Sequence, residues 1–231
     1  MKAIAFLLLA ICPDRSPAQS QTSAEELRRI EVTLQRLESG TWKTLDPGLV
    51  LAQNDRVRFR FRANFEGYLY VLNHSTSGKY EQLFPRRETG ENNRIMADRD
   101  YDVPATDAVF RIAGPAGREI VYWLVSPVSL NDAGSPAYTP LPPPPPQDKH
   151  FAPDLIPRCD DEIFRARGDC VDSSAGPQRI SKEESIPPSL AGRKDLAPRD
   201  LIFLREQGTS IVASPRQLTG PIIYEFRLAH R

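Results

Sequence analysis

The sequence predicts an all-β protein, an antiparallel immunoglobulin-like β-sandwich with a long Pro-rich loop insertion. Short segments with alternating apolar and polar residues are separated by turn clusters at roughly ten-residue spacing, as in antiparallel sheets. No alternation of strands with helical patterns suggests a parallel sheet. The length of 231 residues suits one such domain, and a hydrophobic content of 40% is enough to form a core.

The first twenty residues predict a signal peptide rather than part of the fold. Lys2 precedes an apolar stretch from Ala3 to Ile11, and small residues around Ala18 provide a cleavage site. This stretch is too short to span a bilayer. We therefore expect an exported, soluble protein, periplasmic or extracellular, whose single domain covers residues 21–231.

Residues 23–38 fit two interpretations. Ser23 to Glu26 resembles a helix capping box, and the spacing of Leu27, Ile30 and Leu34 suits a helix. Apolar residues from Ile30 to Leu34 also alternate with polar ones, as in a strand. We expect a short helical lead-in followed by a strand.

Residues 56–62 form the clearest strand pattern. Apolar and basic residues alternate strictly, so Val57, Phe59 and Phe61 are expected to face a core, while the arginines face away from it.

Further strands follow along the chain. Residues 68–72 and 79–84 predict a hairpin, entered at Gly67, where a positive φ or a close backbone approach is expected. Residues 120–125 are apolar on both faces, which predicts a central strand. We also expect strands at residues 109–112, 201–204, 211–213 and 222–228.

The composition changes between residues 127 and 200. This region is loop-like and contains the polyproline segment Pro142–Pro146. After it, residues 222–228 alternate cleanly, with Glu225 and Arg227 outward. Such a strand needs partners, and the simplest are the strands before the insert. We therefore interpret residues 127–200 as an excursion from one domain.

Two cysteines remain once the signal peptide is removed. Cys159 and Cys170 bracket ten residues, which leaves room for the chain to reverse and bring them together. In an oxidising compartment we expect a disulfide that stabilises the fold by about 3 kcal/mol. Two buried free thiols are the alternative; a zinc site is disfavoured because no His pair is nearby.

The best-patterned part of the chain resembles a known family. The resemblance covers residues from about 45 to 128 and identifies this segment as similar to the domain-of-unknown-function family 4384. It implies a bacterial accessory module, found beside kinase-like or caspase-like protease domains and in exported proteins, with no assigned activity. It supplies no catalytic residues. The motifs that carry it are Phe65–Asn73, Gly78-Lys79, Leu83-Phe84-Pro85, Asn92-Asn93-Arg94, Val103-Pro104 and Gly114–Glu119.

The charge distribution offers one candidate binding face. The formal net charge is +0, which argues against a nucleic acid partner. Arg58, Arg60 and Arg62 line one face of a strand. Acids such as Glu81 or Glu119 on neighbouring strands could neutralise them. Alternatively, they form a patch for an anionic polysaccharide or an acidic protein.

Tyr68 and Tyr70 share one face of their strand. One interpretation is that they cover the sheet with their hydroxyl groups in water. The other is an aromatic platform for a sugar or a peptide, joined by Trp42. Exposure and coplanarity of the three rings would distinguish these interpretations.

No motif identifies catalytic residues, a cofactor or a metal site. His74 falls in a hairpin turn, and His150 and His230 are expected to be solvated in a loop and at the terminus. Acidic residues near the cysteines, including Asp160 and Asp172, form a solvated loop in one interpretation and a calcium site in the other.

We therefore expect an exported, non-catalytic β-sandwich interaction module that binds a protein or an envelope polysaccharide. The alternatives are an exported hydrolase, with a site assembled from unlinked loops, and a carbohydrate-binding module. A concave pocket with two titratable groups in hydrogen-bond reach would favour the hydrolase.

Overall fold

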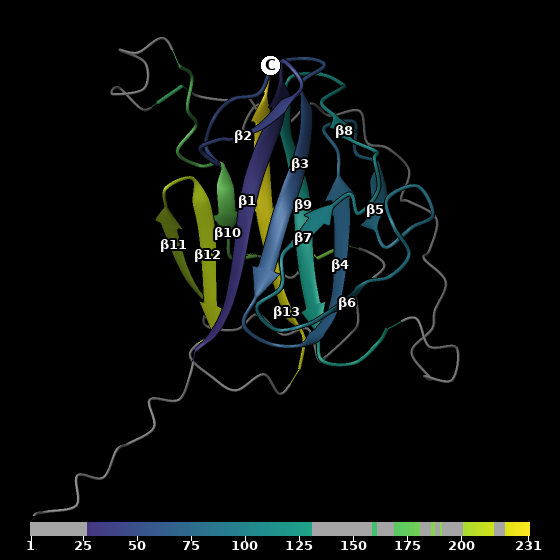
Figure 1. The fold of residues 1–231 in the computed structure, drawn as a ribbon. Helices are drawn as coiled ribbons and strands as arrows, with labels where there is room; N and C mark the ends of the chain where they lie inside the picture. The colour runs from purple at the N-terminus through teal and green to yellow at the C-terminus, as the bar shows by residue number, and fades with distance from the viewer. Residues whose placement is uncertain are drawn as a thin grey trace, which may run out of the picture.

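The computed structural model describes residues 27–130, 159–160, 169–180, 186–187, 190, 201–214 and 220–231. Over these residues the protein is all-β, as expected, with thirteen strands in two antiparallel sheets and no helix. The two sheets lie as layers, with β1 and β3 in front of β9 and β13 (Figure 1). The expected signal peptide, the helical lead-in before Leu27 and the polyproline segment lie outside the described residues.

Sheet 1 has seven strands. Its order is β11-β12-β1-β3-β7, with β2 paired to β1 and β8 paired to β3. The strands are β1 (Arg28–Glu38), β2 (Thr41–Thr44), β3 (Arg56–Ala63), β7 (Tyr101–Val103), β8 (Phe110–Arg111), β11 (Ile202–Glu206) and β12 (Thr209–Ser214).

Sheet 2 has six strands. Its order is β10-β13-β9-β4-β5, with β6 paired to β4. The strands are β4 (Gly67–His74), β5 (Tyr80–Phe84), β6 (Arg94–Ile95), β9 (Gly117–Ser126), β10 (Gly176–Gln178) and β13 (Ile222–His230).

The core lies between the inner faces of the two sheets. Trp123 of β9 is fully buried and meets two rings of β3, with centroid distances of 5.1 Å to Phe59 and 5.7 Å to Phe61. Val57 is also fully buried. The inward positions expected for β3 are therefore confirmed. Each buried ring adds roughly 1.5–3 kcal/mol of burial free energy relative to an exposed one.

The ambiguous segment is a strand wherever it is described. β1 runs from Arg28 to Glu38 and pairs with both β3 and β12. The alternation of apolar and polar residues therefore predicts this segment better than their helical spacing does. The strands on both sides provide hydrogen-bond partners for its backbone N–H and C=O groups.

The predicted hairpin and its glycine are also confirmed. β4 pairs with β5, and β9 is a central strand between β4 and β13. A Cβ added at Gly67 would lie 2.7 Å from the carbonyl oxygen of Ser126. A close backbone approach, rather than a positive φ, therefore requires glycine there.

The last strand pairs with a strand from before the insert. Tyr224 of β13 lies opposite Trp123 of β9. The strand also continues beyond the predicted residue 228, to His230. β10, which lies within the region interpreted as an irregular insert, pairs with the other edge of β13.

The outer face of sheet 2 is covered. Glu225 lies on this face, as predicted, but it is only 1% exposed. Around it is a second apolar cluster, separate from the core, to which residues after β9 and β10 contribute. Its buried members are Tyr70, Leu72, Tyr122, Leu124, Ile180, Leu190 and Ile223.

In the part of the chain that the structure describes, no helix is both long and apolar enough to cross a membrane.

Candidate binding cleft between the two sheets

The inner face of sheet 2 changes from apolar to polar at one end. Asn73 and His230 follow inward-facing apolar residues on β4 and β13, and Glu119 precedes such residues on the antiparallel strand β9 between them. Leu228 lies opposite Glu119, and Val121 lies opposite Asn73. Because side chains alternate along each strand, the three polar side chains all point between the sheets.

A cleft of about 380 Å³ opens beside these residues. Its rim includes the turn after β4 and the loop between β8 and β9. Asn73, Thr76 and Glu119 contribute polar groups to its lining. Its apolar floor comes from both sheets and is formed by Val57, Phe59, Leu83, Phe110, Val121 and Leu228.

Glu119 is the central polar residue of the cleft. Its Oε2 accepts a 2.8 Å hydrogen bond from Nδ2 of Asn73, and its Oε1 accepts two of 3.3 Å from the backbone N–H and hydroxyl of Thr76. Nε2 of His230 lies 3.5 Å from Oε1. Burial alone would raise the pKa of Glu119, but interactions with His230, Asn73 and Thr76 outweigh it and lower the pKa. Glu119 is therefore ionised at neutral pH.

The hydroxyl groups near this cleft do not contact a histidine. Ser75 and Ser77 bond to each other at 2.8 Å. The ring of His74 stacks on Tyr80 at 3.9 Å, and burial lowers its pKa, although the charge of Glu119 partly offsets this. A carboxylate with a lowered pKa is also a weak general base.

His230 was predicted incorrectly as a solvated terminal residue. It is fully buried in β13, because this strand lies between β10 and β9 in its sheet and pairs with β9 as far as His230 itself. The signal was present in the sequence, since extending the alternation of Phe226 and Leu228 by one step places His230 inward.

The charges of Arg58, Arg60 and Arg62 on β3 are largely neutralised, but not by the expected acids. Arg58 and Arg60 share Asp102, at 2.9 and 3.2 Å, and Arg62 lies 3.5 Å from Asp98. The acids proposed from the sequence, on β5 and β9, belong to the other sheet. Sequence separation does not reveal which acid lies opposite in an antiparallel pair, and Arg60 is directly opposite Asp102.

The predicted aromatic platform does not form. Tyr70 is 4% exposed, and its hydroxyl accepts a 2.7 Å hydrogen bond from the backbone N–H of Leu130. Tyr68 is half-buried against the second apolar cluster. Trp42 lies on β2 of the other sheet, where the guanidinium of Arg58 covers its ring at 4.4 Å.

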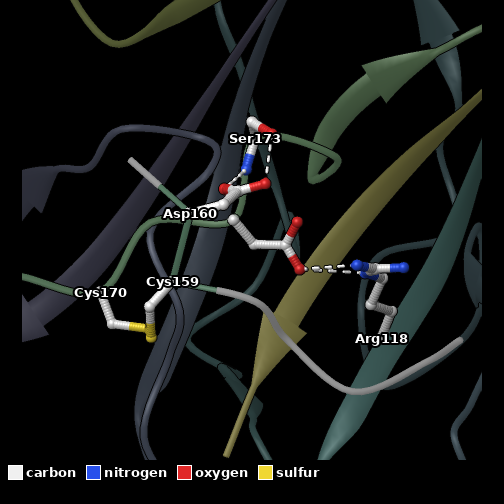
Figure 2. Close-up of a disulfide and its surroundings, with 6 residues drawn as sticks. Arg118, Cys159, Asp160, Cys170 and Ser173 are labelled. Atoms are coloured by element: carbon white, nitrogen blue, oxygen red, sulfur yellow. Dashed lines mark hydrogen bonds and ion pairs between the residues drawn. A yellow bond between two sulfur atoms is a disulfide. The ribbon is translucent and has the colours of Figure 1, made fainter. Parts of the chain in front are cut away.

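The two cysteines form the expected disulfide. Their Cα atoms are 4.7 Å apart, within the usual range (Figure 2). Next to it, the carboxylate of Asp160 accepts hydrogen bonds from the backbone N–H and hydroxyl of Ser173, at 2.8 and 2.7 Å. Cys170 is itself tied to the fold, because its carbonyl accepts a 2.8 Å bond from the N–H of Val50.

A buried ion pair attaches the same segment to sheet 2. The guanidinium of Arg118 on β9 lies 2.7 Å from Oδ2 of Asp172, whose side chain is 0% exposed (Figure 2). Ser174 bonds to the other carboxylate oxygen. Burial would raise the pKa of Asp172, but the bonds from Ser174 and Arg118 outweigh it and lower the pKa.

The calcium interpretation gains no support from this geometry. The carboxylate oxygens of Asp160 and Asp172 already accept hydrogen bonds from protein donors. Within the described ranges, no group of three or more His, Cys, Asp and Glu side chains is arranged to hold a metal.

Comparison with known proteins identifies one segment of the chain. No curated protein and no solved structure matches it. Residues 50–129 match the sequence model of a family described as a domain of unknown function (DUF4384), in agreement with the resemblance over residues 45–128. The matched segment includes Asn73 and Glu119, but neither the disulfide nor His230. Residues 50–129 are therefore the segment of this chain that is similar to the DUF4384 family.

Proposed function

We propose that this protein is an exported, non-catalytic binding module with an immunoglobulin-like β-sandwich fold. Its ligand is part of a partner protein or of another cell-envelope component, and it enters the cleft between the two sheets. Residues 127–200 form a Pro-rich loop insertion, from which Ile180 and Leu190 cover the outer face of sheet 2.

The observation that carries this proposal is the cleft itself. At about 380 Å³ it falls within the usual range of ligand pockets. Like them, it combines apolar and polar side chains in its lining. Phe59 and Phe110 provide the apolar surface on one side, and Glu119 provides the polar group on the other.

Two observations support export. Disulfides such as Cys159–Cys170 persist in oxidising compartments and are rare in the cytosol. The first twenty residues have the composition of a signal peptide. Mass analysis of the exported protein should find an N-terminus between Gln19 and Gln21. A retained Met1, or a lipid on Cys12, would contradict this part of the proposal.

The binding site is tested by blocking the cleft. Titration of the ¹⁵N-labelled protein with 1-hexanol, a neutral apolar probe, should shift the amide signals of cleft residues. Ala113→Trp places a bulky ring at the exposed rim and should abolish these shifts. Ala116→Trp is the matched control, because Ala116 is exposed in the same loop but does not line the cleft. Hexanol shifts confined to other surfaces would reject the cleft as a binding site.

A further inference from the structure

Glu119 is a largely buried carboxylate without a Lys or Arg counter-ion. Its side chain is 12% exposed, and the described residues place one basic group within 4 Å of it, His230, whose charge depends on protonation. Lys79 and Arg111 also line the cleft, but Lys79 pairs with Glu81 at 2.8 Å, and the ion pairs of the described residues join neither of them to Glu119. Buried charges in proteins are normally paired, so this one leaves room for a cation.

The hydrogen bonds to Glu119 are also incomplete. A carboxylate offers about four lone-pair positions. The two bonds from Thr76 to Oε1 are 3.3 Å long, compared with the usual N–H···O distance of about 2.9–3.0 Å. Oε1 can therefore accept a shorter bond from a ligand.

Asn73 provides a second hydrogen-bond acceptor beside Glu119. The carboxylate of Glu119 fixes the orientation of its amide, because only Nδ2 can donate to Oε2. This leaves Oδ1 of Asn73 buried and without a hydrogen-bond partner. This acceptor has no donor of the described residues bonded to it, which favours a ligand that donates.

The rest of the cleft suits an aliphatic chain. Phe59, Phe110 and Leu228 contribute apolar surface to the lining that also contains Glu119. A ligand that fits both parts carries a cationic donor at the end of a methylene stem.

We propose that the cleft binds a primary ammonium group on an aliphatic chain, presented by a lysine side chain of a partner protein. The ammonium donates to Oε1 of Glu119, and the methylene groups lie along the apolar floor. This inference rests on the proposed binding cleft and names the chemistry of its ligand.

The test compares three probes with the same six-carbon stem: hexylammonium, 1-hexanol and hexanoate. Each is titrated into the full chain and followed by the amide signals of cleft residues. A charge-assisted hydrogen bond should make hexylammonium bind roughly 10-fold to 100-fold more tightly than 1-hexanol, and hexanoate should bind most weakly. Nα-acetyl-lysine N-methylamide should shift the same signals.

Glu119→Gln should remove the preference for hexylammonium over 1-hexanol, and a well-dispersed amide spectrum checks that the variant is folded. Glu66→Gln is the matched control, because Glu66 is exposed and lies outside the cleft. Equal binding of hexylammonium and hexanol to the unmodified protein would overturn the ammonium inference and leave the cleft intact. Failure of all three probes to shift cleft residues would reject the proposed function as well.

Discussion

The outer faces of the two sheets differ, although their strands have similar sequence patterns. β3 and β13 both alternate apolar with polar or charged residues. On sheet 1, Arg60 and Arg62 of β3 remain exposed on the outer face. On sheet 2, Glu225 of β13 is buried on the outer face, beneath a segment from between β9 and β11. Alternation therefore tells which side chains face the core, but not whether the opposite face meets water.

The difference in exposure between the two outer faces changes how much an ion pair contributes to stability. Arg60 and Asp102 are 44% and 33% exposed, whereas Arg118 and Asp172 are 8% and 0% exposed. Water and salt screen the first pair, and its partners can be solvated separately at little cost. Neither partner of the second pair can lose the other without leaving a buried charge.

Breaking the buried pair tests this contrast most strongly. Asp172→Ala should lower the free energy of unfolding by about 3–5 kcal/mol, because it leaves the guanidinium of Arg118 without its carboxylate. Asp102→Ala, on the open face, should cost about 1 kcal/mol or less. Urea unfolding measures the free energy of unfolding of both variants. Equal decreases would show that the outer face of sheet 2 is accessible to water.

The disulfide should come next in effect. Replacing both Cys159 and Cys170 with Ser should lower the free energy of unfolding by about 2–4 kcal/mol, because the unfolded chain loses a cross-link. Denaturant unfolding of the unreduced protein and of the double variant checks this. A thiol reagent should label neither cysteine in the unreduced native protein. Labelling of both would show that the disulfide is absent.

The buried Glu225 predicts an unusual dependence on pH. Burial raises its pKa above the ordinary 4.5, and the ion pair with Arg227 only partly offsets this. The charged form therefore costs more in the folded than in the unfolded state. Relative to Glu225→Gln, the stability of the unmodified protein should be greatest below pH 4.5. It should fall as the pH rises through the raised pKa, by about 1.4 kcal/mol for each unit of difference.

Chemical denaturation of both proteins at a series of pH values measures this difference. A gap that did not change with pH would mean that Glu225 is solvated, like the charges on sheet 1. A gap that widened in favour of the unmodified protein as the pH increased would mean that the ion pair with Arg227 outweighs burial.

The smallest effect is expected on the open face of sheet 1. Arg56 of β3 lies directly opposite Arg111 of β8, and both are exposed. Like charges at directly opposite positions repel, so Arg111→Glu should stabilise the fold by about 0.2–1 kcal/mol through a cross-strand ion pair. Thermal unfolding at low and high salt checks this, because added salt should reduce the gain. A salt-independent change would point to packing instead.

Local patterns predicted the parts of the fold in which each side chain has one clear role. Val57, Phe59 and Phe61 of β3 are buried as expected, and the hairpin of β4 and β5 forms around its turn cluster. The spacing of Cys159 and Cys170 was sufficient to predict their disulfide. These features depend on the two-residue period of a strand or on short loops, and both can be seen in a single stretch of chain.

The candidate site could not be found in this way. Asn73, Glu119 and His230 are far apart in the sequence, and each taken alone resembles an ordinary surface residue. The pairing of β4, β9 and β13 brings them together. Burial alone would raise the pKa of Glu119, but the neighbours that this pairing supplies outweigh it and lower the pKa.

The amino-acid pattern thus set the strand class, the inward faces and the disulfide, because each follows from the geometry of neighbouring residues. Strand order, the covering of sheet 2 and the surroundings of Glu119 in the cleft depended on contacts between distant segments. Those contacts, rather than any one segment, determine how deeply each charged side chain is buried. Burial in turn determines how strongly charges interact, because the effective dielectric constant is lower inside the protein.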